Sequence, residues 1–228
     1  MLSFLKRIFD HPSIQFLAES LSAPDQNSGP VFLFGLARPA KALVIAALAR
    51  RLRRPLIVLT TDNEAAERLG AMTATFFGWF GEPASAVVNL PFFDVTPYES
   101  RSPHPEIAER RAIALGNIAA NRVRALFAPA PVACQRFRNK SYYHSLSLNL
   151  ALGDEISIGD LIDHLAGTGY ESHEPADSVG CYSMRGGIID VFPPLADWPF
   201  RIEFLGDQIE SIREFDPDTQ RSRRPVEA

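Results

Sequence analysis

Short apolar runs and amphipathic segments alternate along the first 140 residues of the chain. Apolar runs that are typical of buried strands cover residues 30–37, 55–62, 86–91 and 125–134. Segments with apolar residues at helical spacing separate these runs. Such alternation indicates βαβ units, so we expect an α/β domain with a parallel sheet over residues 31–140.

Helix signals bound the segments between the runs. Residues 40–54 are predicted to form one helix, and residues 63–81 a second one that Asp62 or Asn63 caps at its N-terminus. A long third helix is expected after Pro105. The aromatic residues near the end of the second helix are expected in the core of this domain: Phe76, Phe77, Trp79 and Phe80.

The N-terminal segment has a pattern of its own. Residues 1–21 carry apolar side chains at helical spacing, and residues 22–30 form a polar connector rich in turn residues. We therefore expect an amphipathic helix and a connector over residues 1–30, ahead of the α/β domain.

The pattern changes after about residue 140. A short helix is predicted at 159–166, and the segments after it have strand character, separated by proline or glycine turns. This predicts a small α+β domain over residues 145–222 with an antiparallel β-meander, followed by a tail at 223–228. The strands expected in the meander are 188–192, 200–205 and 208–215, of which the first two flank a turn at 193–198.

Charge supports a division into two modules. The 228 residues have a net charge of −4, but residues 1–140 contain 17 basic and 11 acidic side chains, and residues 141–228 contain 6 and 16. A change from net positive to net negative within one chain indicates two surfaces of different character.

Several classes of function lack support in the sequence. No apolar run reaches the roughly 20 residues of a membrane span, and no export signal is recognisable at the N-terminus. The two cysteines, Cys134 and Cys181, have neither metal-ligand spacing nor the pattern of a disulfide framework. The five histidines show no ligand spacing either. We therefore predict a cytoplasmic protein with reduced thiols, no metal site and no catalytic residues.

One glycine-containing loop has the frame of a nucleotide-binding motif. Residues 35–42 keep the frame of a Walker A loop, G-x-x-x-x-G-K-[ST], with Gly35 and Lys41 in place. Ala40 replaces the second glycine, and Ala42 replaces the hydroxyl residue that would bind Mg²⁺. Three interpretations stay open: a degenerate relic, a coincidence in an alanine-rich helix start, and a working site. We expect no bound cofactor and no ATP hydrolysis.

The second half carries motifs of a known family. Residues 185–193, 199–204, 207–216 and 219–222 closely resemble the UvrB-like N-terminal region of the bacterial transcription-repair coupling factors. Earlier segments agree with this resemblance: Gly35-Leu36, Lys41-Ala42, Leu90-Pro91, Asp94, Pro97-Tyr98-Glu99, Ser102-Pro103, Ile107, Arg110, Gly169-Tyr170 and Val179-Gly180.

The resemblance implies a fold, partners and a larger parent protein. It implies a RecA-like domain with a degenerate Walker A loop, followed by a small domain similar to the one by which UvrB binds UvrA. Full-length members of this family continue into an RNA-polymerase-binding domain and an ATP-driven DNA translocase, so we expect this chain to be a fragment of such a protein or a truncated homologue. RNA polymerase and DNA would be reached through those parts, and the translocase could also pack against this region.

The same resemblance implies site residues. Arg185, Arg201 and Leu205 match positions that contact UvrA in the family, although Leu205 replaces an aromatic residue. Strand counting offers a second interpretation, because Arg201 falls opposite Asp190, where a cross-strand ion pair would account for it. Strict alternation also places Arg185 on the core face, unless a bulge at Gly186-Gly187 returns it to the face of Arg201.

Two other functions stay open. A nucleotide-dependent DNA helicase or translocase fragment would bind ATP tightly with Mg²⁺, and a non-specific DNA-binding module would use the basic first domain. We interpret the basic residues concerned as a solvated face in preference to a DNA contact: Arg50, Arg51, Arg53, Arg54, Arg110, Arg111, Arg122 and Arg124.

Overall fold

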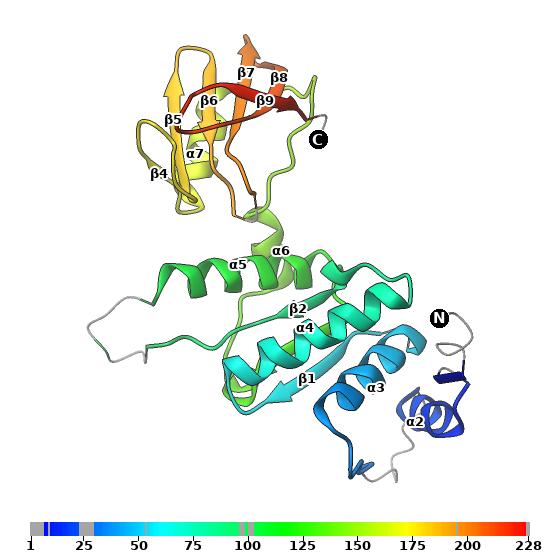
Figure 1. Cartoon of the computed structure of the whole chain (residues 1–228). Helices are drawn as coiled ribbons and strands as arrows, with labels where there is room; N and C mark the ends of the chain where they lie inside the picture. Colours follow the sequence, from blue (N-terminus) through cyan, green and yellow to red (C-terminus); the bar gives the residue numbers. More distant parts are fainter. Residues whose placement is uncertain are drawn as a thin grey trace. The chain divides into compact units, whose positions relative to one another are not determined.

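A computed structural model gives the structure of the protein, and Figure 1 shows its elements. The chain divides into two compact units, Met1–Ser141 and Tyr142–Ala228, each of which is described by itself. Residues 1–6 and 9 of the predicted N-terminal helix, Arg53 of the basic residues, and Pro97-Tyr98 and Ser102 of the family motif lie outside the described part. The structure describes residues 7–8, 10–22, 30–52, 54–95, 99, 103–194 and 196–226.

The first unit contains a parallel sheet between helices. Its three strands have the order β1-β3-β2, and β3 pairs in parallel with both neighbours, which confirms the predicted parallel sheet. The elements are α2 (Pro12–Ser22), α3 (Arg38–Arg51), β1 (Leu56–Thr60), α4 (Asn63–Trp79), η1 (Ala84–Ala86), β2 (Val87–Asn89), α5 (Pro105–Ala119), β3 (Ala125–Pro129) and η2 (Ala130–Cys134).

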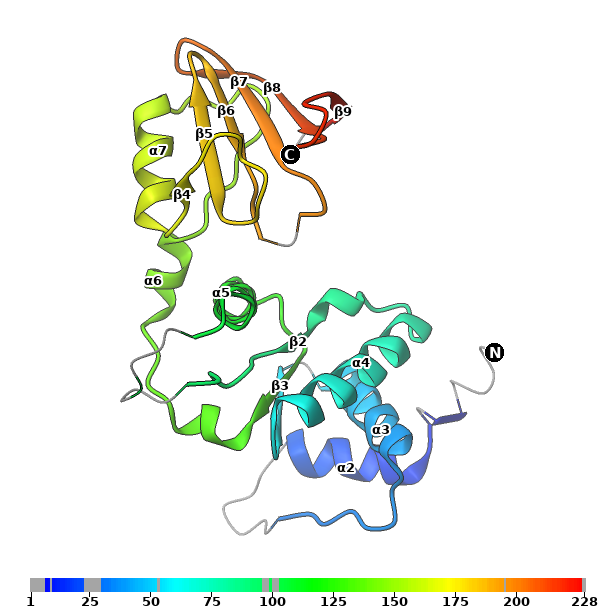
Figure 2. The same cartoon turned by 60° about the vertical axis from the view of Figure 1, so that its left-hand side comes forward.

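Helices pack on both sides of this sheet. Ala46 of α3 and Phe77 of α4 pack with Phe127 of β3 in one buried cluster. Ala114 of α5 packs with Val88 of β2 in another on the opposite side (Figures 1 and 2). On that side β1 stays open, since Ile57 and Leu59 are 68% and 52% exposed. Of the four aromatic residues expected in the core, Phe77 and Phe80 are buried and Phe76 is partly buried. Trp79 is 47% exposed, so its prediction was wrong.

Helix α4 begins where its sequence indicates. The carboxylate of Asp62 accepts a hydrogen bond from the backbone N–H of Ala65 at 2.7 Å, which is the geometry of an N-cap. This bond and one from the Thr61 hydroxyl hold the pKa of Asp62 below its usual value, because both favour the ionised carboxylate. The predicted N-cap is therefore confirmed as Asp62.

The prediction of a buried strand over residues 30–37 was wrong. This segment forms no strand, and its apolar side chains are exposed, with Phe32 at 70% and Phe34 at 86%. The two rings stack on each other, with their centroids 6.1 Å apart. Apolar character alone does not distinguish a core strand from an exposed apolar segment, because the difference depends on a sheet partner elsewhere in the chain.

The second unit is one six-stranded sheet with a helix packed against it (Figure 2). The strands follow the order β4-β5-β6-β7-β8-β9, and β5 to β9 pair antiparallel, which confirms the predicted meander. The elements are α6 (Lys140–Ser145), which crosses the division between the units, α7 (Ile158–Gly167), β4 (Glu171–Ser172), β5 (Cys181–Arg185), β6 (Ile188–Val191), β7 (Phe200–Leu205), β8 (Gln208–Phe215) and β9 (Ser222–Pro225).

One face of this sheet forms the core of the second unit. Leu161 and Leu165 of α7 pack against a row of isoleucines that crosses the sheet, Ile189, Ile202 and Ile212. Strand β9 was not predicted, because residues 223–228 read as a polar tail. It pairs with β8 and extends the sheet by one strand.

No helix in the described part of the chain has both the length and the apolar character needed to cross a membrane.

Candidate functional site

The sheet face opposite the isoleucine row carries a line of polar side chains. The strand register places Ser183, Asp190, Arg201 and Arg213 side by side across β5 to β8. Because side chains alternate between the two faces of a strand, these residues lie on the face that α7 does not cover. The sheet therefore brings polar groups from four strands together, three of them charged.

Asp190 lies at the centre of this row and is buried, with 2% of the residue exposed. Its carboxylate accepts two hydrogen bonds from Arg201, from Nε at 2.7 Å and from Nη2 at 2.8 Å. A third bond comes from Nη2 of Arg185 at 3.1 Å. A buried carboxylate needs such partners, because an unpaired charge in the interior costs several kcal/mol, of the order of 5.

Arg201 is held by an aromatic ring and by the Asp190 carboxylate. Its guanidinium lies over the ring of Phe215, 4.5 Å from the centroid, and its side chain is 15% exposed. The hydrogen bond with Asp190 raises the pKa of Arg201, because it stabilises the charged form. The cross-strand ion pair between Arg201 and Asp190, one of the two sequence interpretations, is thus present in the structure.

Arg185 reaches the same carboxylate from the end of β5. It pairs with Ile188 across a two-residue turn at Gly186-Gly187, in which Gly186 has a φ of +60°, a conformation that suits glycine. The expected bulge is therefore a hairpin turn, and Arg185 lies on the face of Asp190. Its side chain is 49% exposed, so part of the guanidinium faces solvent.

Leu205 ends β7 at the next hairpin turn. It is 67% exposed, although it pairs with Gln208 of β8. Strand alternation places Leu205 on the face of Arg201, because the two positions on β7 are four residues apart, which is an even number. Leu205 and Arg185 both lie near the end of the sheet where Ile188 pairs with Glu203.

Gln220 completes the arrangement and was missed by the sequence analysis. Its side-chain Oε1 accepts from Nη2 of Arg201 at 2.9 Å and from Nη2 of Arg185 at 3.4 Å. No local pattern could reveal this contact, since Gln220 is 35 residues from Arg185 in the chain. We call Arg185, Asp190, Arg201 and Gln220 the arginine cluster.

The sequence of this sheet matches a known protein family. The model described as UvrB interaction domain matches residues 148–228, a range that contains the whole arginine cluster. The matched relatives are transcription-repair-coupling factors. The one from Myxococcus xanthus is 36% identical over 190 residues, and the one from Escherichia coli K12 is 31% identical over 189. Over most of its length, the chain is similar to one segment of the transcription-repair-coupling factors.

The match covers most of this chain and a small part of each relative. The aligned region is 82% of this chain for the Myxococcus xanthus protein and 83% for the Escherichia coli protein, but 16% of each of those proteins. A relative from Haemophilus influenzae is 30% identical over 199 residues, which are 87% of this chain and 17% of that protein. The chain therefore spans about one sixth of the length of these transcription-repair-coupling factors.

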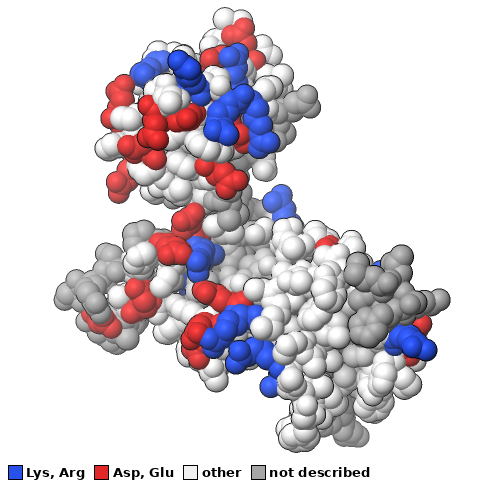
Figure 3. All heavy atoms as spheres, in the orientation of Figure 1, with Lys and Arg blue, Asp and Glu red and all other residues white. Residues whose placement is uncertain are grey.

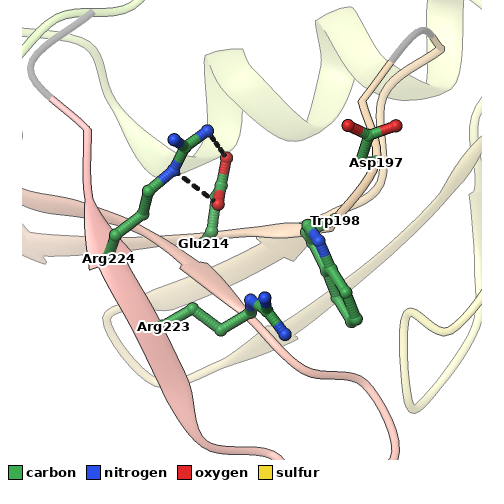
Figure 4. Close-up of a pocket in the computed structure, with 5 residues that line it drawn as sticks. All are labelled: Asp197, Trp198, Glu214, Arg223 and Arg224. Carbon is green, nitrogen blue, oxygen red and sulfur yellow. Dashed lines mark hydrogen bonds and ion pairs between the residues drawn. The ribbon is translucent and has the colours of Figure 1, made fainter.

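A second charged group of the second unit lies at β9 (Figure 4). Arg224 donates two hydrogen bonds to the Glu214 carboxylate, at 2.8 and 2.7 Å, and the Arg223 guanidinium lies 3.8 Å from the centroid of Trp198. Together with Asp197 these residues line an open pocket of about 390 Å³. Both contacts join β9 to the rest of the sheet, so we interpret them as the reason that this polar segment becomes a strand.

Basic and acidic groups are unevenly distributed on the second unit. Figure 3 shows acidic side chains over much of its visible surface and basic side chains gathered in a few places. All six basic residues of positions 141–228 follow the start of β5, and each belongs to a strand or to the loop between β8 and β9: Arg185, Arg201, Arg213, Arg221, Arg223 and Arg224.

In the first unit, residues 35–42, which keep the frame of a Walker A loop, lead into helix α3. Helix α3 begins at Arg38, Lys41 is exposed, and Ala42 is fully buried. The side chain at the hydroxyl position therefore packs in the core. No group of three or more His, Cys, Asp or Glu side chains that could hold a metal ion occurs among the described residues.

Two of the first unit's arginines have structural roles. Arg111 is buried at 6% exposure, bonds to the carbonyl of Pro91 and lies over the ring of Phe93 at 4.1 Å. Arg124 donates to the carbonyls of Ala49 and Leu52, at 2.9 and 3.0 Å, near the end of α3. Neither side chain is the solvated basic group that phosphate contact would require.

Proposed function

We propose that the second unit is a docking module that binds UvrA and so recruits excision repair to stalled transcription. The observation that carries this proposal is the match of residues 148–228 to the UvrB interaction domain, which contains the arginine cluster. By the same likeness, the parent protein would be a cytoplasmic, ATP-dependent DNA translocase that removes stalled RNA polymerase.

The chemistry of the surface suits a partner with carboxylates. The two arginines and the one aspartate of the arginine cluster have a net charge of +1, and the half-exposed guanidinium of Arg185 presents it. Arginine has a planar set of donors that matches carboxylate oxygens and is enriched where protein interfaces bind most strongly. Leu205 adds an exposed apolar contact nearby. We propose Arg185, Arg201 and Leu205 as the UvrA-binding residues.

The test uses Leu205, which is 67% exposed, so its replacement is expected to leave the fold intact. Leu205→Asp is expected to weaken UvrA binding at least tenfold, because it places a charge in an apolar contact that binding would bury. Isothermal titration with purified UvrA measures the affinity. Val179→Asp is the matched control, since Val179 is 44% exposed and lies two residues before β5, whose other end is Arg185. Equal loss in both variants, or in neither, would contradict the assigned surface.

We also propose that the first unit is a RecA-like domain that does not hydrolyse ATP, and that it could pack against the translocase of its own parent protein. The parallel order β1-β3-β2 between helices supports the fold, and Ala40 and Ala42 support the loss of activity. Incubation with ATP and Mg²⁺ is expected to release no phosphate above the protein-free rate. Steady turnover that Lys41→Ala abolishes would contradict this.

A further inference from the structure

The loop between β8 and β9 places one neutral side chain between the two arginines. The amide nitrogen Nε2 of Gln220 donates to the carbonyl of Pro217 at 2.8 Å. Since that nitrogen can only donate, the bond fixes the orientation of the amide and turns Oε1 toward the guanidinium groups. Oε1 then accepts from Arg201 at 2.9 Å and from Arg185 at 3.4 Å.

The backbone of this loop holds Gln220 firmly. The Asp216 carboxylate accepts from the backbone N–H of Asp218 at 2.9 Å and of Thr219 at 3.2 Å, and the Gln220 N–H donates to the Asp216 carbonyl at 2.7 Å. Gln220 itself has a φ of +59°, in the left-handed region that non-glycine residues seldom adopt. Such a conformation persists where surrounding bonds enforce it, as they do here.

The two arginines depend on Gln220 to different degrees. Arg201 is bound twice by Asp190 and covers Phe215, so its position is determined without Gln220. Arg185 has one bond to Asp190 at 3.1 Å and a looser approach to Glu174 at 3.9 Å. Gln220 therefore restricts the more exposed of the two guanidinium groups.

We propose that Gln220 is a positioning residue that holds the Arg185 guanidinium, against Arg201, in the orientation that the docking partner binds. This inference rests on the proposed function of the second unit. An amide suits the role because it accepts from both arginines without adding a negative charge. A glutamate at this position would cancel the net charge of +1 that the arginine cluster presents.

The test is a double-mutant cycle between Gln220 and Arg185, read as affinity for UvrA. Gln220→Met keeps the length of the side chain and removes its hydrogen bonds, and it is expected to weaken binding about tenfold. In an Arg185→Ala background the same change is expected to alter the affinity less than twofold. Asp218→Asn is the control in the same loop, because Asp218 is exposed and its backbone bond to Asp216 is kept.

Two outcomes of the cycle would overturn the proposal. Unchanged affinity in Gln220→Met shows that the amide does not position the contact, and effects that multiply in the double variant show that Gln220 acts independently of Arg185. A ¹⁵N NMR spectrum of the arginine Nε–H groups supplies a measurement without UvrA, and Gln220→Met is expected to shift the Arg185 and Arg201 signals.

The NMR measurement separates the two proposals. If the wild-type chain does not bind UvrA, the proposed function fails and the docking role of Gln220 fails with it, although shifted arginine signals would still establish the contact. If the wild-type chain binds UvrA and the arginine signals are unchanged in Gln220→Met, the positioning role alone is overturned.

Discussion

Arg201→Ala is expected to destabilise the second unit by about 3–5 kcal/mol, which is the usual cost of removing one partner of a buried ion pair. Asp190 is 2% exposed and loses its two shortest hydrogen bonds in this variant. Phe215 also loses the guanidinium that covers it. Hydrogen exchange at the amides of Ile189 and Ile202 measures this stability within the second unit alone.

The matched control removes both charges. In Arg201→Ala the buried Asp190 carboxylate keeps only its bond from Arg185. When Asp190→Ala is added, that poorly paired carboxylate is gone, so part of the lost stability is expected to return despite the additional cavity. If the amides of Ile189 and Ile202 exchanged as slowly in Arg201→Ala as in the wild type, the ion pair would not contribute to the stability of the sheet. Weak UvrA binding by Arg201→Ala therefore needs this stability measurement beside it.

Arg185→Ala is expected to lower the affinity for UvrA while the stability of the second unit stays nearly unchanged. The side chain is 49% exposed, and Arg201 continues to neutralise Asp190, so the stability of the second unit should change little. Affinity for UvrA is expected to fall by about 30-fold or more, the effect of truncating an arginine that dominates an interface. Surface plasmon resonance with immobilised UvrA gives the affinity, and thermal unfolding gives the stability.

Arg213→Ala is the control for charge on the same face. Arg213 lies beside Arg201 in the strand register, is 45% exposed and approaches Glu203 at 3.5 Å. A comparable loss in both variants would mean that UvrA responds to the general charge of this face. Wild-type affinity in Arg185→Ala would remove Arg185 from the proposed contact.

Local sequence patterns were sufficient to predict the strands that carry the site and the pairing of Arg201 with Asp190. Alternation located β6, β7 and β8, and counting across the turn at 193–198 placed Arg201 opposite Asp190, where the structure has it. The contribution of Gln220 could not be predicted, because it depends on a loop that folds back over the sheet and on one amide orientation. Strand β9 was missed because Arg223 and Arg224 look like a solvated tail until their partners Trp198 and Glu214 are known.

In the first unit a strand was predicted that the structure does not contain. The run at 30–37 has the composition of a core strand, but its side chains are exposed, since no strand in the described part of the chain pairs with it. Composition measures how favourable burial would be, and the arrangement of distant segments decides whether burial occurs. By contrast, Asp62 caps α4 through a residue three positions away, so a short stretch of sequence was enough to predict it.

The fixed arginine cluster also affects two quantities of the proposed docking, its association rate and the side-chain entropy lost on binding. A free arginine side chain has about 2 kcal/mol of rotamer entropy that an interface must remove. For Arg201 the bonds to Asp190 and Gln220 remove that freedom when the chain folds, before any partner arrives. Association should then resemble the meeting of two rigid surfaces, with a rate that charge steering raises and added salt lowers.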